Sequence, residues 1–175
     1  YKMKLNSIFL CLIFLGLISC KKGAVEKGKI KIDTSHITVK SYSYNELKPL
    51  LEKKNDSIYV INFWATWCAP CVKELPAFEK LNKEYASKKV TVLLVSLDFP
   101  KQVEKKLIPF IARKNVRSKV ILLDDINEDV WIKAIDSSWS GAIPATIIYN
   151  KESRKFYEKT LDYETLEKEL QTFLK

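Results

Sequence analysis

The sequence predicts an α/β fold in which helices cover both faces of a mixed central sheet. Short apolar runs rich in β-branched residues alternate with longer segments of helical periodicity, an order typical of parallel strands joined by helices. Near the C-terminus two strand-like runs are separated by a short turn, which adds antiparallel strands. The chain has 175 residues, of which 47% are hydrophobic, so it can build one domain with a substantial core.

Each element follows from its local pattern. Strands are expected at 37–42, 57–63, 90–97, 119–123, 145–149 and 155–159. Helices are expected at 44–54, 69–87, 101–114, 128–135 and 163–174. Ser43 or Asn45 can cap the first helix, and Pro76 is expected to kink the second because proline lacks the backbone N–H. The near-continuous apolar run at 90–97 predicts a central strand covered on both faces.

The N-terminal segment has the pattern of an export signal. Lys2 and Lys4 flank the start of an apolar run at 5–18, which at about 14 residues is shorter than the ~20 that a bilayer crossing needs. The run ends in Leu17-Ile18-Ser19-Cys20, which resembles the lipobox of bacterial lipoproteins. We therefore expect Cys20 to receive a lipid. The alternative is a signal anchor with an incidental cysteine.

These assignments define the expected organisation of the chain. It comprises a lipoprotein signal peptide (1–19), a tether (20–35) and one folded domain (36–175). A lipid on Cys20 would anchor the domain in the bacterial cell envelope, extracytoplasmic and facing the periplasm, where disulfides persist. Because Cys11 lies in the removable signal, Cys68 and Cys71 are the thiols left in the mature domain.

The net charge of +9 arises from lysines spread along the chain. A solvated surface explains this distribution, and no stripe of arginines with interleaved aromatic residues indicates nucleic-acid binding. One histidine, His36, and one cysteine pair are too few for the four ligands of a structural zinc site. We therefore expect no metal, no nucleic-acid partner and no cofactor beyond a redox-active disulfide.

The predicted chemistry depends on Cys68 and Cys71, which lie between a strand and a helix. Two cysteines three positions apart at a helix start bring their sulfurs within bonding reach. The unpaired N–H groups and the positive dipole end of the helix favour the thiolate of the first cysteine. Cys68 is thus the expected nucleophile, and Cys71 the thiol that resolves the mixed disulfide. The alternative is a structural staple, although so short a loop gains little chain entropy.

The motifs resemble those of the thioredoxin superfamily. Ile61-Asn62-Phe63-Trp64-Ala65-Thr66-Trp67-Cys68-Ala69-Pro70-Cys71, with Pro76 five positions later, resembles its active-site segment, and Gly141-Ala142-Ile143-Pro144-Ala145-Thr146 resembles its cis-proline loop. The extra strand and helix within 90–119 and the expected anchor are similar to TlpA-like and ResA-like membrane-tethered thiol-disulfide oxidoreductases. The resemblance covers residues 36–174 and implies a thioredoxin-like three-layer sandwich with a TlpA-type central insertion.

The resemblance also implies a substrate groove beside the cysteines. Its expected contacts are Trp67, Ala69, Pro70, Ile143 and Pro144. A cis bond at Pro144 would turn the Ile143 backbone towards Cys68, ready to pair with an extended substrate. Trp64 is expected in the core, and Trp139 either packs in the core or lines the groove.

One position departs from thioredoxin. Asn62 stands where thioredoxins carry a buried aspartate, and an amide cannot accept the proton of Cys71. Asp98, at the end of the central strand, and Glu74, one turn into the helix, are the possible proton acceptors. The pattern around each of them favours a solvated surface carboxylate.

Together these features predict a lipid-anchored, extracytoplasmic reductase of protein disulfides. By resemblance, its substrates would be exported proteins such as apocytochrome c, and its electrons would come from a membrane thiol-disulfide relay protein. No histidine lies between the cysteines, which favours a reductant over a strong oxidant. Net oxidase or isomerase activity and a non-catalytic thioredoxin-fold binding module remain the alternatives. The Pro-x-x-x-Thr-x-x-Cys pattern of peroxiredoxins is absent, which disfavours a peroxidase.

Overall fold

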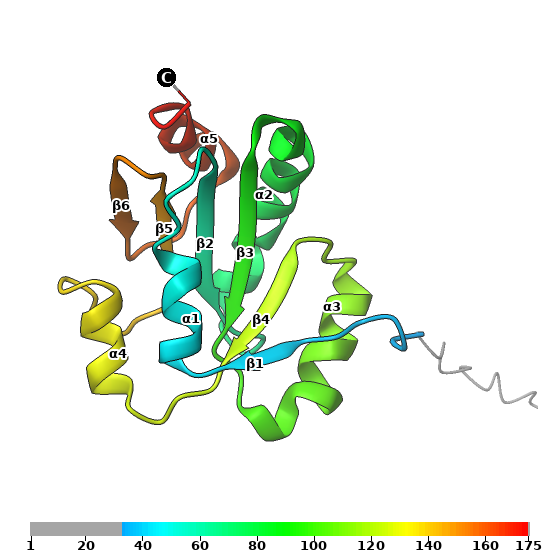
Figure 1. Cartoon of the computed structure of the whole chain (residues 1–175). Coiled ribbons are helices and arrows are strands. Elements are labelled where there is room, and N and C mark those ends of the chain that lie inside the picture. The colour runs from blue at the N-terminus through cyan, green and yellow to red at the C-terminus, as the bar shows by residue number, and fades with distance from the viewer. Residues whose placement is uncertain (1–32, 175) are drawn as a thin grey trace, which may run out of the picture. The chain divides into compact units, whose positions relative to one another are not determined.

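The computed structural model describes residues 33–174 (Figure 1), so the predicted signal peptide, the lipid site at Cys20 and most of the tether lie outside the described residues. Six strands form one sheet in the order β1-β4-β3-β2-β5-β6. Their bounds are β1 Lys40–Tyr42, β2 Ile58–Trp64, β3 Val90–Ser96, β4 Lys119–Leu123, β5 Ala145–Tyr149 and β6 Arg154–Tyr157. The first four strands of this order run parallel, and β5 and β6 are antiparallel additions. The predicted mixed α/β sheet is confirmed.

Helices connect these strands. Their bounds are α1 Tyr44–Leu51, α2 Ala69–Tyr85, α3 Ile108–Lys114, α4 Glu128–Ile135 and α5 Tyr163–Gln171. A 3₁₀ turn at Pro100–Gln102 and a π turn at Val103–Leu107 lead into α3, so the predicted helix at 101–114 consists of three kinds of turn. Within residues 33–174, no helix combines the length and the apolar character that a membrane crossing requires.

The sheet separates two apolar cores, because successive side chains of a strand point to opposite faces. On β2, Val60 and Trp64 pack with residues of α2, α3 and α5, whereas Ile61 and Phe63 pack with residues of α1 and α4. Figure 1 shows α1 and α4 on one face and α2 and α3 on the other. This arrangement is the predicted three-layer sandwich, and Trp64 lies in its core as expected.

The first strand is shorter than predicted. It begins at Lys40, because the Ile37 N–H donates to the Thr34 carbonyl in a turn and thus does not join the ladder with β4. The helix that follows begins after Ser43, whose backbone N–H donates to the Glu46 carboxylate over 2.8 Å. Of the two predicted caps, Ser43 and Asn45, the structure therefore confirms Ser43.

The first helix also ends three residues earlier than predicted, at Leu51. The Tyr149 hydroxyl donates to the Leu50 carbonyl over 2.7 Å, and the Arg154 guanidinium donates to the Leu51 carbonyl over 3.2 Å. These donors come from β5 and β6, about a hundred residues along the chain. The end of this helix is thus set by tertiary contacts, which its local sequence does not reveal.

The parallel strands determine where the functional loops meet. β2, β3 and β4 point the same way, so the loops at their carboxyl ends lie at one edge of the sheet. These loops are 65–68, 97–99 and 124–127. The loop before β5 reaches the same edge, because β5 starts opposite Phe63, near the end of β2.

Candidate active site

Cys68 and Cys71 form a disulfide at the start of α2, with their Cα atoms 5.3 Å apart. Cys68 is the N-cap residue of the helix, and its Sγ accepts a hydrogen bond from the Cys71 N–H at 3.3 Å. Cys68 is 6% exposed and Cys71 is completely buried. The predicted placement of the first sulfur against the free N–H groups of a helix end is confirmed. The burial difference makes Cys68 the sulfur that a partner can reach.

The loop before β5 approaches Cys68 from the other side. The peptide bond between Ile143 and Pro144 is cis, as predicted, and the Ile143 carbonyl oxygen lies 3.7 Å from Cys68 Sγ. The Ile143 side chain is half-buried, and Pro144 is buried beneath the loop. A chain segment that forms a disulfide with Cys68 would therefore meet the Ile143 backbone at once.

Trp139 and Glu158 hold this loop, and sequence reasoning did not single out Glu158. Trp139 is fully buried and donates its indole N–H to the Ala142 carbonyl over 2.8 Å, so its predicted alternative place in the groove is wrong. Glu158, just after β6, accepts from the N–H of Ser140 and from the N–H of Ala142 at 3.1 Å each. A hydrogen bond from the Ser140 hydroxyl, helped by these two, lowers the pKa of Glu158 and keeps it charged. The role of Glu158 comes from a contact between segments 16 to 18 residues apart, which its local sequence does not reveal.

Asp98 is buried, which corrects the expectation of a surface carboxylate. It follows β3 and accepts three hydrogen bonds: from the Thr66 N–H at 3.0 Å, the Thr66 hydroxyl at 2.5 Å and the Ser96 hydroxyl at 2.8 Å. Thr66 lies two residues before Cys68. The observed contacts of Asp98 therefore fix the loop that leads to the disulfide.

Glu74 is also buried, at 3% exposure, which corrects the same expectation. Its carboxylate accepts from the Asn62 side-chain N–H₂ and from the Leu161 N–H, each at 2.8 Å. Burial raises the pKa of Glu74 to about 7, and the two hydrogen bonds oppose that rise. Glu74 lies one helical turn after Cys71 on α2. An acid with a pKa of about 7 is therefore one turn away from the residue that carries the buried sulfur.

A pocket of about 310 Å³ opens beside the disulfide. Trp67, 58% exposed, and Ile143 connect this pocket to Cys68, and Phe99 and Ile126 also line it. The predicted contacts Ala69 and Pro70 are exposed at the first turn of α2. The structure thus gathers the predicted contact residues round one sulfur. Phe99 and Ile126 were missed, because no local pattern distinguishes an exposed apolar residue of a loop from a buried one.

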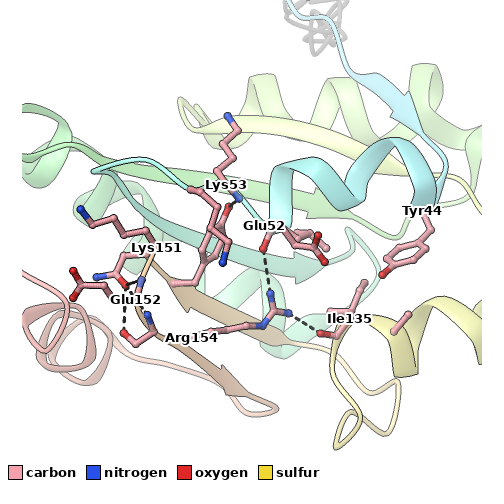
Figure 2. A pocket seen from close by; sticks show the side chains of 13 residues that line it. Tyr44, Glu52, Lys53, Ile135, Lys151, Glu152 and Arg154 are labelled. Atoms are coloured by element: carbon pink, nitrogen blue, oxygen red, sulfur yellow. Dashed lines mark hydrogen bonds between the residues drawn. The ribbon is translucent and has the colours of Figure 1, made fainter.

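A second pocket, of about 520 Å³, lies near the amino end of β2 (Figure 2). Arg154 donates to the Leu51 carbonyl at 3.2 Å and to the Ile135 carbonyl at 2.6 Å, the last residues of α1 and α4. Lys53, Lys54 and Lys151 add positive charge around it. We call this the basic pocket.

The chain matches the AhpC/TSA family over residues 36–154. Thioredoxin-like protein YneN of Bacillus subtilis (strain 168) is 37% identical over 92 residues, which cover 53% of this chain and 51% of YneN. Thiol-disulfide oxidoreductase ResA of Bacillus thuringiensis (strain Al Hakam) is 30% identical over 130 residues, which cover 74% of this chain and 66% of ResA. The match thus spans about half the length of the first relative and about two thirds of the second.

Solved structures agree with the observed fold. The thiol:disulfide interchange protein from Chlorobium tepidum TLS, a thioredoxin family protein, superposes with a TM-score of 0.58 at 17% identity, covering 73% of this chain and 85% of that one. A likeness at this identity shows the fold alone. The described residues therefore have the thioredoxin fold, as the motifs implied.

Proposed function

The chain belongs to the AhpC/TSA family, and we propose that it is a protein thiol-disulfide oxidoreductase that works through Cys68 and Cys71. The observation that carries the proposal is the disulfide itself. The Cys68 sulfur is reachable and accepts a hydrogen bond at the N-terminus of α2, and the Cys71 sulfur is buried one turn away. The names of these relatives, thiol-disulfide oxidoreductase ResA and thioredoxin-like protein YneN, fit this chemistry.

The exchange follows from these positions. In the reduced protein the Cys68 thiolate attacks a substrate disulfide, and one substrate sulfur leaves as a thiolate that takes up a proton. Cys71 then loses its proton and attacks Cys68 Sγ, which releases the second substrate sulfur. Two electrons pass to the substrate, which ends as a dithiol, and the protein ends as the Cys68–Cys71 disulfide.

Glu74 is the proposed acceptor for the Cys71 proton. A carboxyl whose pKa is raised to about 7 exchanges protons near neutral pH, whereas the amide of Asn62 cannot accept one. Asn62 Oδ1 has no hydrogen-bond partner among the described residues. Rotation of this amide would present Oδ1 to a protonated Glu74, at the cost of the bonds that its N–H₂ donates to Thr146 Oγ1 and the Ala145 carbonyl. Asp98, the other predicted acceptor, is assigned to the loop instead, because its bonds are with Thr66 and Ser96.

The direction and the setting of the reaction are part of the proposal. We infer a reductase of disulfides in exported proteins, apocytochrome c among them, with electrons from a membrane thiol-disulfide relay protein. A lipid on Cys20, after removal of 1–19, would tether the domain to the envelope through 20–35. No cofactor beyond the cysteine pair is needed, because the sulfurs carry both electrons.

A trapping experiment tests this function. Cys71→Ser removes the resolving sulfur, so mixed disulfides through Cys68 are expected to accumulate and to disappear on treatment with dithiothreitol. Cys68→Ser is the matched control, because it leaves the buried sulfur in place and removes the reachable one. If both variants capture the same amount of disulfide substrate, Cys68 is not the nucleophile and the proposal is wrong.

The alternatives make different predictions. A net oxidase would have a Cys68–Cys71 couple more oxidising than protein dithiols, which equilibration with glutathione measures. A binding module with a structural disulfide would bind its partner equally well with Cys68 and Cys71 both changed to Ser. The reductase proposal requires a couple more reducing than glutathione and exchange that stops in the double variant.

A further inference from the structure

Most of the exposed large apolar side chains of the described residues line the pocket beside the disulfide. The four such side chains are Trp67 (58%), Phe99 (61%), Ile126 (93%) and Val130 (66%). The first three line the pocket of about 310 Å³, which reaches Ile143 and hence the surroundings of Cys68 Sγ. Apolar side chains that a fold leaves exposed beside a reactive group are typical of a binding surface. We call this pocket and its rim the redox groove.

Four loops build the redox groove. Trp67 precedes α2, Phe99 follows β3, Ile126 lies between β4 and α4, and Ile143 precedes β5. The groove thus extends from the disulfide across the carboxyl ends of the parallel strands to the start of α4. An extended peptide that pairs with the Ile143 backbone would place its neighbouring side chains along these residues.

The rim of the redox groove is acidic, although the chain as a whole is basic. The chain has 30 Lys and Arg against 21 Asp and Glu. Yet the described residues that line the groove include Asp98, Asp124, Asp125 and Glu128 and no lysine or arginine. Asp124 and Glu128 are exposed. The reactive end of a positive molecule therefore carries a local negative potential.

Two of these carboxylates lack charged partners. Asp98 is occupied by Thr66 and Ser96, and Asp125 accepts from the Tyr44 N–H at 3.0 Å and the Asn127 N–H at 3.0 Å. Asp124 has one long contact, 3.4 Å, with the Ser41 hydroxyl. Neither Asp124 nor Glu128 takes part in the three ion pairs of residues 33–174. Their charge is available to a ligand.

We propose that the redox groove selects extended, unfolded polypeptide segments that carry apolar and basic side chains next to a disulfide cysteine. The apolar side chain packs against Trp67, Phe99 and Ile126, and a lysine or arginine pairs with Asp124 and Glu128. Folded proteins bury such apolar residues, so the groove favours unfolded partners. Acidic disulfides are repelled by the same rim. The inference rests on the proposed exchange function and adds a substrate class to it.

Binding of cysteine-free peptides tests the charge selection without requiring exchange. Two peptides share an apolar centre and carry Lys or Glu at the flanking positions, and calorimetry measures their affinity for the full oxidised chain. We expect the Lys peptide to bind roughly tenfold more tightly at low salt, with the difference shrinking at high salt. Changing Asp124→Asn and Glu128→Gln together should reduce the difference to about twofold.

The basic pocket supplies the matched control. Glu52→Gln with Glu152→Gln changes the net charge by the same amount, at exposed residues of that pocket. This variant should keep the preference for the Lys peptide. If the two double variants lose the preference equally, net charge and not the groove selects the peptide, and the inference is overturned.

A second pair of variants tests the apolar part. Ile126→Ser should weaken binding of the Lys peptide several-fold, whereas Val130→Ser, at an exposed residue outside the pocket lining, should leave it unchanged. Equal affinity of the Ile126 variant and the unaltered chain would overturn the apolar contact. Exchange with the neutral 2-hydroxyethyl disulfide is measured in parallel. If the protein did not exchange with this disulfide, the proposed function would be overturned. The inference about peptide selection would be judged separately, because the peptide affinities do not depend on exchange.

Discussion

The redox groove and the basic pocket lie at opposite ends of β2 and are built on opposite principles. The groove is the smaller, about 310 Å³ against about 520 Å³, but its apolar side chains are exposed and two of its carboxylates lack charged partners. In the basic pocket the central cation, Arg154, is bonded to two backbone carbonyls. Volume alone would favour the basic pocket as the candidate site, although its central cation is already bonded within the fold. A candidate binding site is distinguished by exposed apolar side chains and by charged groups that have no partner within the fold.

The basic pocket is explained by helix ends. The last carbonyls of a helix lack partners within it and form the negative end of the dipole. Arg154 supplies charged donors to the final residues of α1 and α4, and Tyr149 supplies a hydroxyl to α1. Figure 2 shows the guanidinium placed between the two helix ends. The side chains of this pocket therefore stabilise the fold. Variants in the basic pocket should lower stability and leave exchange unchanged, whereas variants near the disulfide should slow exchange.

The largest expected effect is on exchange. Cys68→Ser should slow reduction of 2-hydroxyethyl disulfide by roughly a thousandfold or more, since the nucleophile is gone. The free energy of unfolding, measured against the reduced unaltered chain, should change by less than about 1 kcal/mol, because serine is nearly isosteric. A variant that retained a tenth of the rate would contradict the comparison.

Next comes the pH dependence of stability, through Glu74. Its pKa is about 7 in the fold and near the ordinary 4.5 in the unfolded chain. Below pH 4.5 both states hold the proton. As pH rises towards 7, the unfolded chain releases it first, so stability falls by about 3 kcal/mol. Glu74→Gln should remove this fall, which urea titrations of the reduced proteins at pH 4.5 and 7.5 would measure. An equal fall in the variant would contradict the role of burial.

Rotation of Asn62 would let this variant keep a hydrogen bond between positions 62 and 74, in exchange for the bonds from the Asn62 N–H₂ to Thr146 and Ala145. A glutamine at position 74 can keep its oxygen towards the Leu161 N–H and turn its N–H₂ towards Asn62. Asn62 Oδ1 has no partner among the described residues and can accept that bond. The variant should therefore fold at both pH values, and its reduced activity near neutral pH would report the lost proton acceptor and not a misfolded core.

A smaller effect is expected at the basic pocket. Arg154→Ala removes two bonds to helix-end carbonyls, so the free energy of unfolding should fall by about 2 kcal/mol. Exchange with 2-hydroxyethyl disulfide should stay within about twofold, because the pocket lies at the other end of β2. Lys54→Ala is the control: it removes the same charge from an exposed side chain that lines this pocket and should cost less than about 0.5 kcal/mol.

The sequence predicts those parts of the site that adjacent residues determine. The strand before Cys68, the helix after it and the three-residue spacing together place two sulfurs at a helix start. The fold class follows from the same short-range periodicities, and the cis bond at Pro144 follows from a resemblance. These are features whose physical cause lies within a few residues of where they act.

The remainder depends on contacts between distant segments. The burial of Glu74 and Asp98 comes from the chain around Leu161 and from Thr66, and a carboxylate in a polar stretch carries no mark of such burial. The exposure of Phe99 and Ile126 is equally invisible, because an apolar residue in a loop is usually buried. The motifs therefore implied the part of the redox groove formed by Trp67 and Ile143, whereas the part formed by Phe99 and Ile126 could be identified only from the structure.

The smallest predicted effect concerns the loop that carries Cys68. Thr66→Val keeps the shape of the side chain but removes the hydroxyl that donates to Asp98, so the free energy of unfolding should fall by about 1 kcal/mol. Thr91→Val, at an exposed position of β3, is the matched control and should be neutral. Exchange should slow several-fold in the Thr66 variant alone, because Cys68 lies two residues further on, and Thr66→Ser should restore both quantities. If stability fell while exchange stayed unchanged, the bond between Thr66 and Asp98 would contribute to stability alone, as the bonds of Arg154 do. The two ends of β2 would then differ only in the exposed surface of the redox groove.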